Sequence, residues 1–130
     1  MHHMWTWLAV AAGGAIGSMA RHGVNRIVMD GWPALRFPVA TVIVNVLGSC
    51  AFGVLAGLIA SNRLDLRPHW REFVFVGLLG GFTTFSTFAG DVVTLARGGF
   101  QASAAVNVLL QVGLSIAGLY LGLTMSMRQA

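Results

Sequence analysis

The sequence predicts an all-α membrane protein with four transmembrane helices. Of its 130 residues, 56% are hydrophobic and only 9% are charged, whereas about a quarter of the residues in soluble domains are charged. Four apolar runs, at residues 5–28, 39–60, 72–96 and 102–127, each reach the ~20 residues that a helix needs to cross a bilayer. We therefore expect residues 1–130 to fold as a single four-span membrane domain.

The first run continues past a charged residue. No Lys or Arg precedes the run, so it reads as a retained helix rather than as a secretory signal. A helix that ended before Arg21 would have only about 16 residues, which is short for a bilayer. We therefore expect Arg21 to face a wet vestibule or the protein interior, where a charge is usually functional. The alternative is that its side chain snorkels to the lipid headgroups.

The second run carries a polar residue near its middle. Asn45 lies there, and Thr41 lies one turn earlier on the same helix face. An amide at that depth offers both N–H donors and an acceptor. It can therefore contact an ion, or it can hydrogen-bond to a neighbouring helix, a contact worth about 1 kcal/mol or less.

The third run is predicted to be a broken helix. The pair Gly80 and Gly81 weakens helical structure, because glycine loses the most backbone entropy on ordering. Unwound backbone in a bilayer is tolerated only where protein or a water-filled cavity satisfies its polar groups. We expect the break between Gly80 and Thr84, and broken membrane helices tend to build ion sites.

Aromatic rings and hydroxyls follow the expected break. Phe85 and Phe88 are three residues apart and share one face, while Thr84 and Thr87 share a neighbouring face with Ser86 close by. Ring edges are electropositive, so ring edges and hydroxyls together can replace part of an anion's water shell without a full positive charge. The alternative is that these residues only pack against other helices.

The fourth run carries a polar stripe. Asn107, Gln111 and Ser115 are spaced four residues apart along one helix face. The stripe can line the same permeation path, or it can form hydrogen bonds between helices. Ser115 is the member that we favour as a pore residue.

The arginines give no preferred orientation in the membrane. With a cytoplasmic N-terminus, the two sides of the membrane would receive equal sets, Arg63, Arg67, Arg71 and Arg128 inside and Arg21, Arg26, Arg36 and Arg97 outside. A chain without a positive-inside bias can insert in both directions. Four short helices can scarcely enclose a pore alone, so we expect a dual-topology antiparallel homodimer.

Several other classes of function are not indicated. The net charge of +4 comes from arginines scattered singly among apolar runs, not from a basic face that would bind nucleic acid. The acids lie near the ends of the apolar runs or in connections, and no Ser or Cys has an evident base partner. We therefore expect neither an enzyme nor a nucleic-acid-binding protein, and no further protein partner is evident.

Three stretches carry a resemblance to a known family. These are the nine residues Gly-Gly-Phe-Thr-Thr-Phe-Ser-Thr-Phe at 80–88, the Gly-rich segment at 13–22 and the segment at 37–49. Together with the length and the four runs, they resemble the small bacterial fluoride channels of the Fluc or CrcB family. The resemblance implies a fluoride-selective channel in the bacterial inner membrane, exporting fluoride passively through two pores per antiparallel dimer and so lowering its cellular concentration.

The resemblance also implies roles for single residues. Asn45 resembles the pore asparagine of the family, which donates to fluoride beside the paired phenylalanines, here Phe85 and Phe88. Backbone carbonyls of Gly80 and Thr83 are implied to hold a structural sodium ion on the dimer axis. An arginine follows the same Gly-rich segment in the family, which favours the vestibule for Arg21. The remaining expected pore residues are Thr41, Ser86, Thr87 and Ser115.

Two rival functions remain open. A small dual-topology multidrug or cation exporter would also be short and antiparallel, but proton-coupled export needs a titratable acid deep in the membrane. The first run has no Asp or Glu, and Asp91 lies towards the end of the third. A structural assembly factor would leave the cluster of Phe, Thr and Ser unexplained.

Overall fold

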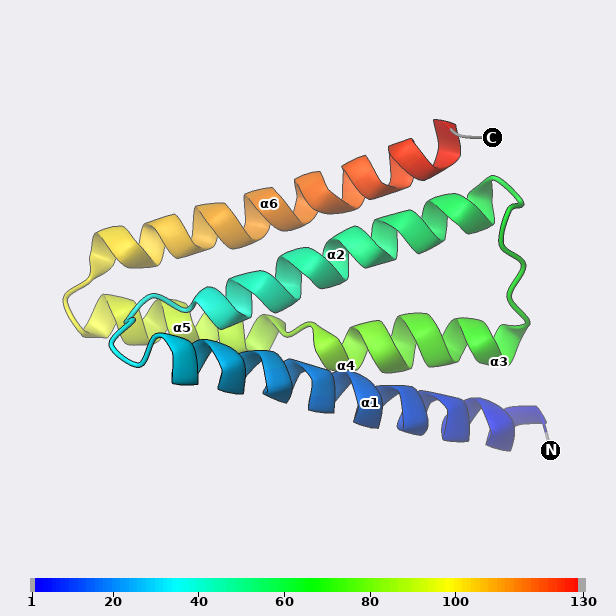
Figure 1. The fold of residues 1–130 in the computed structure, drawn as a ribbon, viewed down its shortest axis with the longest axis horizontal. Coiled ribbons are helices and arrows are strands. Elements are labelled where there is room, and N and C mark those ends of the chain that lie inside the picture. Colours follow the sequence, from blue (N-terminus) through cyan, green and yellow to red (C-terminus); the bar gives the residue numbers. More distant parts are fainter. Residues whose placement is uncertain (1, 129–130) are drawn as a thin grey trace.

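The computed structural model describes residues 2–128, and all regular structure in that range is helical. The elements in chain order are α1 (His2–Gly31), α2 (Val39–Ala60), α3 (Pro68–Arg71), the π-helix η1 (Glu72–Leu79), α4 (Gly80–Phe82), α5 (Phe85–Arg97) and α6 (Gln101–Arg128). Elements α3 to α5 follow one another almost without a gap and form one long segment (Figure 1).

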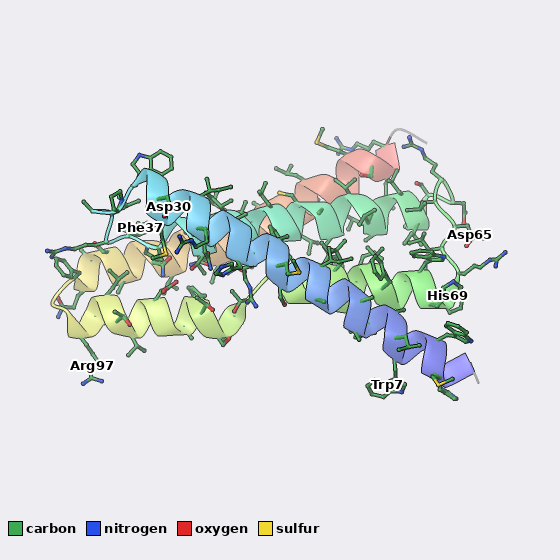
Figure 2. The ribbon with its side chains drawn as sticks, turned by 60° about the horizontal axis from the view of Figure 1, so that its bottom comes forward. Trp7, Asp30, Phe37, Asp65, His69 and Arg97 are labelled. Atoms are coloured by element: carbon green, nitrogen blue, oxygen red, sulfur yellow. The ribbon has the colours of Figure 1, made fainter. Side chains whose placement is uncertain are left out.

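The long segments alternate in direction. The beginning of α1, the connection from α2 to α3 and the end of α6 lie at one end of the bundle, and the other two connections lie at the opposite end (Figure 1). Helix α2 packs along α6, whereas α1 packs against η1 and α4. Seen from the side, α1 runs obliquely across the rest of the bundle (Figure 2). This is the antiparallel arrangement that short connections between long helices produce.

The helices begin and end close to the first and last residues of the predicted apolar runs. Helix α2 spans Val39–Ala60, as the run at 39–60 predicts. The other helices extend beyond their runs, and α1 reaches from His2 to Gly31. The third segment begins earlier than predicted, with Pro68 at its first helical position, where the missing N–H costs nothing. Polar end residues continue the backbone hydrogen bonding past the apolar part, which hydropathy alone does not detect.

Three helical segments in the described range are long and apolar enough to cross a membrane. They are Val39–Ala60, Pro68–Arg97 and Gln101–Arg128. Helix α1 has 30 residues, but Arg21, His22 and Arg26 make its second half more polar. The protein is therefore an all-helical membrane protein with at least these three spans, and the crossing of α1 stays a prediction.

Glycines allow the helices of each pair to approach closely. A methyl group added at Gly17 of α1 would overlap the backbone carbonyl of Leu78, and one at Gly53 of α2 would overlap that of Leu119. Such contacts between backbones need small residues on membrane helices. The two pairs, α1 with η1 and α2 with α6, are thus held together along their lengths by backbone proximity.

The glycine pair of the third segment is helical, contrary to the expectation that it would unwind. Gly80 has φ −63° and ψ −38°, and a side chain at Gly81 would crowd the backbone of Gly14 on α1. The extended residues come later: Thr83 has φ −82° and ψ 160°, and Thr84 has φ −155° and ψ 117°. Close packing against α1, rather than unwinding, therefore explains Gly81.

Candidate functional site

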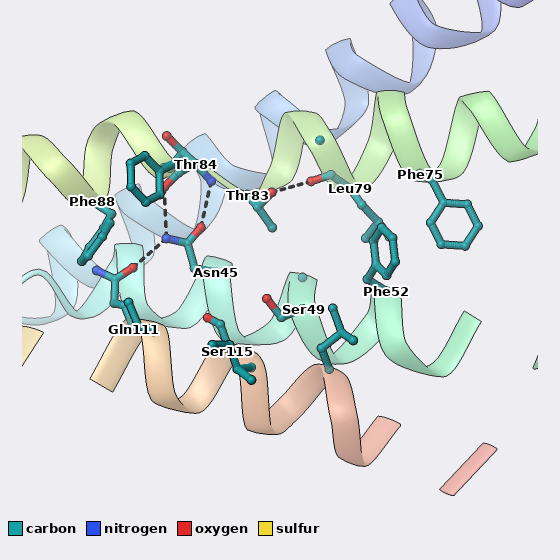
Figure 3. Close-up of a pocket in the computed structure, with 16 residues that line it drawn as sticks. Asn45, Ser49, Phe52, Phe75, Leu79, Thr83, Thr84, Phe88, Gln111 and Ser115 are labelled. Atoms are coloured by element: carbon teal, nitrogen blue, oxygen red, sulfur yellow. Dashed lines mark hydrogen bonds between the residues drawn. The ribbon is translucent and has the colours of Figure 1, made fainter. Parts of the chain in front are cut away.

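A cavity of about 400 Å³ lies between α2, α6 and the extended residues of the third segment (Figure 3). Among the described residues, those that line it carry no charged side chain. Four of them are phenylalanines and six have polar side chains: Phe52, Phe75, Phe85 and Phe88, and Asn45, Ser49, Thr83, Thr84, Gln111 and Ser115. Apolar walls with a few convergent polar groups are typical of small-ligand sites.

Thr84 begins helix α5. Its Oγ1 accepts a hydrogen bond from the backbone N–H of Thr87 (3.2 Å), and it donates to Thr87 Oγ1 (3.1 Å). This is the N-cap arrangement that Ser and Thr favour, because it satisfies an N–H that the first helical turn leaves without a partner. Ser86 Oγ lies 3.3 Å from the same hydroxyl oxygen. The hydroxyls of the motif are therefore used in part to start the helix.

Asn45 holds the extended Thr84 in place. The Thr84 N–H donates to Asn45 Oδ1 (2.8 Å), and Asn45 Nδ2 donates to the Thr84 carbonyl (3.1 Å). Asn45 Nδ2 also donates to Gln111 Oε1 on α6 (2.6 Å; Figure 3). The Asn45 amide thus joins α2 to the start of α5 and to α6. A hydrogen bond between helices was one of the two roles predicted for this residue.

Two backbone carbonyls lose their helical donors at the same point. In a continuous helix, the N–H groups of Thr84 and Thr87 would donate to the carbonyls of Gly80 and Thr83. They donate instead to Asn45 Oδ1 and to Thr84 Oγ1. These are the two carbonyls expected to hold sodium, and freed carbonyl oxygens of an interrupted helix suit such a hard cation. Gly80 is exposed, so a ligand could reach it.

The two phenylalanines of the motif contact each other edge to face. The ring centroids of Phe85 and Phe88 lie 5.4 Å apart, with an angle of 66° between the planes. Phe88 is buried with 8% of its surface exposed, whereas Phe85 is 77% exposed. Both rings line the cavity, so their electropositive edges are available on its wall.

The stripe on α6 divides between the cavity and the bundle interior. Gln111 and Ser115 line the cavity. Asn107 is fully buried and accepts a hydrogen bond from Gln111 Nε2 (2.9 Å). Among the described residues, neither Asn107 Nδ2 nor Ser115 Oγ has a hydrogen-bond partner. Because Gln111 also accepts from Asn45 of α2, the stripe takes part in a hydrogen bond between helices and also faces the cavity.

The other expected site residues lie outside the cavity lining. Thr41 is buried, and its Oγ1 donates to Asp91 Oδ2 (2.8 Å). Ser86 and Thr87 are exposed on the first turn of α5, and Arg21 is partly exposed in the second half of α1. Their roles in a pore or vestibule stay predictions.

Sequence reasoning missed several contacts of the site. It did not pair Thr41 with Asp91, which lie 50 residues apart. It did not place Phe52 and Phe75, whose rings lie 4.8 Å apart, on the cavity wall. Such contacts depend on which helices are neighbours, which a single sequence does not state. The one available signal was that Asp91 is the only acid in the interior of α5.

Comparisons with known proteins agree with the motifs. Residues 8–123 match the family described as "CrcB-like protein, Camphor Resistance (CrcB)". The "Fluoride-specific ion channel FluC" of Rhodospirillum centenum is 45% identical over 118 residues, covering 91% of this chain and 92% of the relative. Proteins of the same name from Erythrobacter litoralis and Paracoccus denitrificans are similar as well. The Erythrobacter litoralis protein is 42% identical over 127 residues, covering 95% of this chain and 93% of the relative. The Paracoccus denitrificans protein is 46% identical over 119 residues, covering 92% of each chain.

Proposed function

Because the chain belongs to the CrcB-like family, we propose that it is a fluoride-selective channel that exports fluoride passively and so lowers its concentration in the cell. Relatives that cover most of the chain are named fluoride-specific ion channels. The protein is an ion channel rather than an enzyme, and it is a multi-pass protein of the bacterial inner membrane.

The observation that carries the proposal is the uncharged lining of the cavity. Its amides, hydroxyls and ring edges meet in one place, where they can replace part of the water around a small anion. Conduction needs binding that is favourable enough for entry and weak enough for exit. An arginine or lysine in the lining would hold the anion too strongly for rapid release.

Passive export follows from the membrane potential. Hydrogen fluoride enters a cell from an acidic medium without charge, dissociates inside and leaves fluoride trapped as an anion. A unit charge crossing the membrane gains about 2.3 kcal/mol for each 100 mV. With the interior negative, a selective pore therefore drives fluoride out without an energy source of its own.

We further propose that the pores form in an antiparallel homodimer of dual topology. With the four predicted spans, the two sides of the membrane receive four arginines each, which supports insertion in both directions. The start of α5 leaves Phe85 77% exposed, and Gly80, Ser86 and Thr87 are exposed beside it. A second copy on this face would cover these residues and complete two pores, each lined by both chains.

The proposed third helix is a single crossing that is interrupted at Thr83 and Thr84, and the proposed sodium ion lies at this interruption. The carbonyls of Gly80 and Thr83 lack their helical donors, and the same pair from the second copy would complete the coordination. When bound, sodium would hold the two copies together rather than take part in conduction.

The alternative is a small dual-topology exporter of drugs or other cations. Its one supporting feature is Asp91, an acid within α5. The Asp91 carboxylate accepts a hydrogen bond from Thr41 and does not line the cavity. An exporter of cations would need an acid facing its substrate path, so this alternative is the weaker one.

Ion flux from liposomes tests the proposal. Liposomes with the purified protein, loaded with fluoride or chloride, are expected to release fluoride much faster than chloride. The control is protein-free liposomes under the same gradient. Equal release of the two anions would contradict selectivity, and proton-driven uptake of an organic cation would favour the exporter.

A further inference from the structure

A second cavity, of about 940 Å³, lies between the start of α1 and the beginning of the third segment. We call it the end groove, because it lies at the end of the bundle that holds the start of α1 and the connection from α2 to α3 (Figure 1). Its larger lining residues are Trp5, Leu8, Arg67, His69, Trp70 and Phe73. It shares no described lining residue with the cavity beside the extended threonines, so it is a separate site.

The end groove forms because α1 and the third segment separate towards this end. A methyl group added at Gly13 would overlap the backbone carbonyl of Phe73, so the two helices touch there. From this contact α1 runs obliquely away from α3 (Figure 2). Ala9 and Ala12 also line the groove, and their small side chains leave space on the α1 side.

The walls of the end groove are apolar and accessible. Trp5, Leu8 and Trp70 are each more than half exposed. Trp70 contacts Phe73 edge to face, with ring centroids 5.6 Å apart and an angle of 78° between the planes. These two rings belong to the first turns of a segment that is long and apolar enough to cross the membrane. Tryptophan is enriched where the hydrocarbon core meets the headgroups, so the groove opens towards lipid at that level.

The charge in the end groove is basic. Among its described lining residues, Arg67 and His69 are the only ones with a titratable side chain, and Asp65 and Glu72 do not line it. Arg67 is exposed and forms no ion pair with another described residue. A guanidinium group matches the geometry of a phosphate, and an imidazole has an N–H donor in either protonation state. A free phosphate would leave the apolar walls unused, whereas a phospholipid uses both parts.

We propose that the end groove binds an anionic phospholipid of the surrounding bilayer, with its phosphate at Arg67 and His69. One acyl chain lies along Trp5, Leu8 and Phe73. Basic residues beside membrane helices attract anionic lipids, and the apolar walls hold the chain by removing its surface from the polar interface. The bound lipid fills the space where α1 and the third segment separate, so it supports their packing at this end. The proposal needs insertion into a membrane but not conduction of fluoride.

Quenching of tryptophan fluorescence by brominated lipids tests the proposal. Trp7→Phe and Trp32→Phe are introduced together, so that Trp5 and Trp70 are the remaining tryptophans. The full-length protein is placed in phosphatidylcholine vesicles that contain a minor fraction of either brominated phosphatidylglycerol or brominated phosphatidylcholine. The anionic lipid is expected to reach half-maximal quenching at an about fivefold lower fraction, which corresponds to the about 1 kcal/mol that an arginine contributes near anionic lipid.

Removing the basic groups tests where the lipid binds. In the double variant Arg67→Gln, His69→Gln, the preference for the anionic lipid should be lost. Arg71→Gln is the matched control, because Arg71 is an exposed arginine of the same segment that does not line the groove. This variant should keep the preference.

Filling the groove gives a second readout that leaves the charges in place. Ala12→Phe places a ring in the space for the acyl chain and should lower the quenching by the anionic lipid to that of phosphatidylcholine. Ala11→Phe, at an exposed neighbour outside the lining, should quench as the parent does.

Three results would overturn the proposal. Equal quenching by the two lipids would show that Trp5 and Trp70 touch only bulk lipid. Absence of quenching by either lipid would show that protein, such as a second copy of the chain, covers the groove. A preference that survives in the double variant would place the anionic lipid elsewhere on the protein.

Discussion

The two faces at the start of α5 differ in what surrounds them. On the inner face, Thr84 and Phe88 are buried, and Thr84 is fixed by Asn45. On the outer face, Phe85 is 77% exposed and Ser86 and Thr87 are exposed beside it. Neighbouring residues of one motif are thus buried and hydrogen-bonded within the chain on one face, and exposed on the other. The inner face is complete within one chain, whereas the outer face is the part that we propose a second copy completes.

Removing sodium should have the largest effect, because it acts on the outer face and on the whole assembly. In buffer with potassium in place of sodium, we expect the dimer to dissociate and fluoride flux to be lost, since a ligand that binds only the assembled state stabilises it. Size-exclusion chromatography and flux measure the two effects, and both should recover when sodium is returned. Full activity without sodium would count against the central site.

Asn45→Leu breaks the inner face. It leaves the Thr84 N–H and Gln111 Oε1 without their partners, and each buried group left without a partner costs about 1–3 kcal/mol. We expect a clear drop in the thermal unfolding temperature in detergent together with loss of flux. Asn25→Leu, the same change on α1, is the control. Unchanged stability in Asn45→Leu would show that the amide does not hold the break in the helix.

Phe88→Ile tests the aromatic edge on the buried side. The substitution keeps an apolar side chain but removes the ring, and an aromatic contact of about 1.5 kcal/mol corresponds to about a tenfold change in rate. Fluoride flux should therefore fall by at least that factor while the dimer persists. Phe85→Ile is the matched change on the exposed side. Wild-type flux in Phe88→Ile would reduce that ring to a packing role.

Ser115→Ala should have the smallest effect and the cleanest interpretation. Its hydroxyl lines the cavity and has no partner among the described residues, so its removal breaks no hydrogen bond of the scaffold. We expect unchanged unfolding and a fluoride flux lower by a few-fold, because one neutral hydrogen bond is worth about 1 kcal/mol. Unchanged flux would remove Ser115 from the permeation path.

Hydropathy predicted the ends of the helices better than the glycine pair predicted the place of the interruption. The bounds of α2 follow from an uninterrupted apolar run with no competing signal. Gly80 and Gly81 were expected to unwind, but both are helical, and close packing against Gly14 gives Gly81 a role inside the helix. The extended residues are the threonines that follow, because Asn45 and the Thr84 hydroxyl replace the helical hydrogen bonds there. That replacement needs a partner 39 residues away, so local propensity could not locate it.

The site was predictable in its residue types but not in its contacts. Asn45, Phe85, Phe88 and Ser115, which the sequence singles out in three different apolar runs, line one cavity. The sequence did not reveal that Gln111 occupies a donor of Asn45 or that Thr41 binds Asp91. Both contacts join helices that are distant in sequence. The spacing of the polar stripe on α6 does not indicate which residue of another helix it contacts.

Selection of fluoride by uncharged groups is the central claim, and a reversal potential tests it most directly. The protein is placed in a planar bilayer with fluoride on one side and chloride on the other, and the voltage of zero current is measured. A fluoride-selective pore should give a voltage that follows the fluoride concentration and does not respond when the chloride concentration is changed. A voltage that shifts with chloride to the same extent would contradict it.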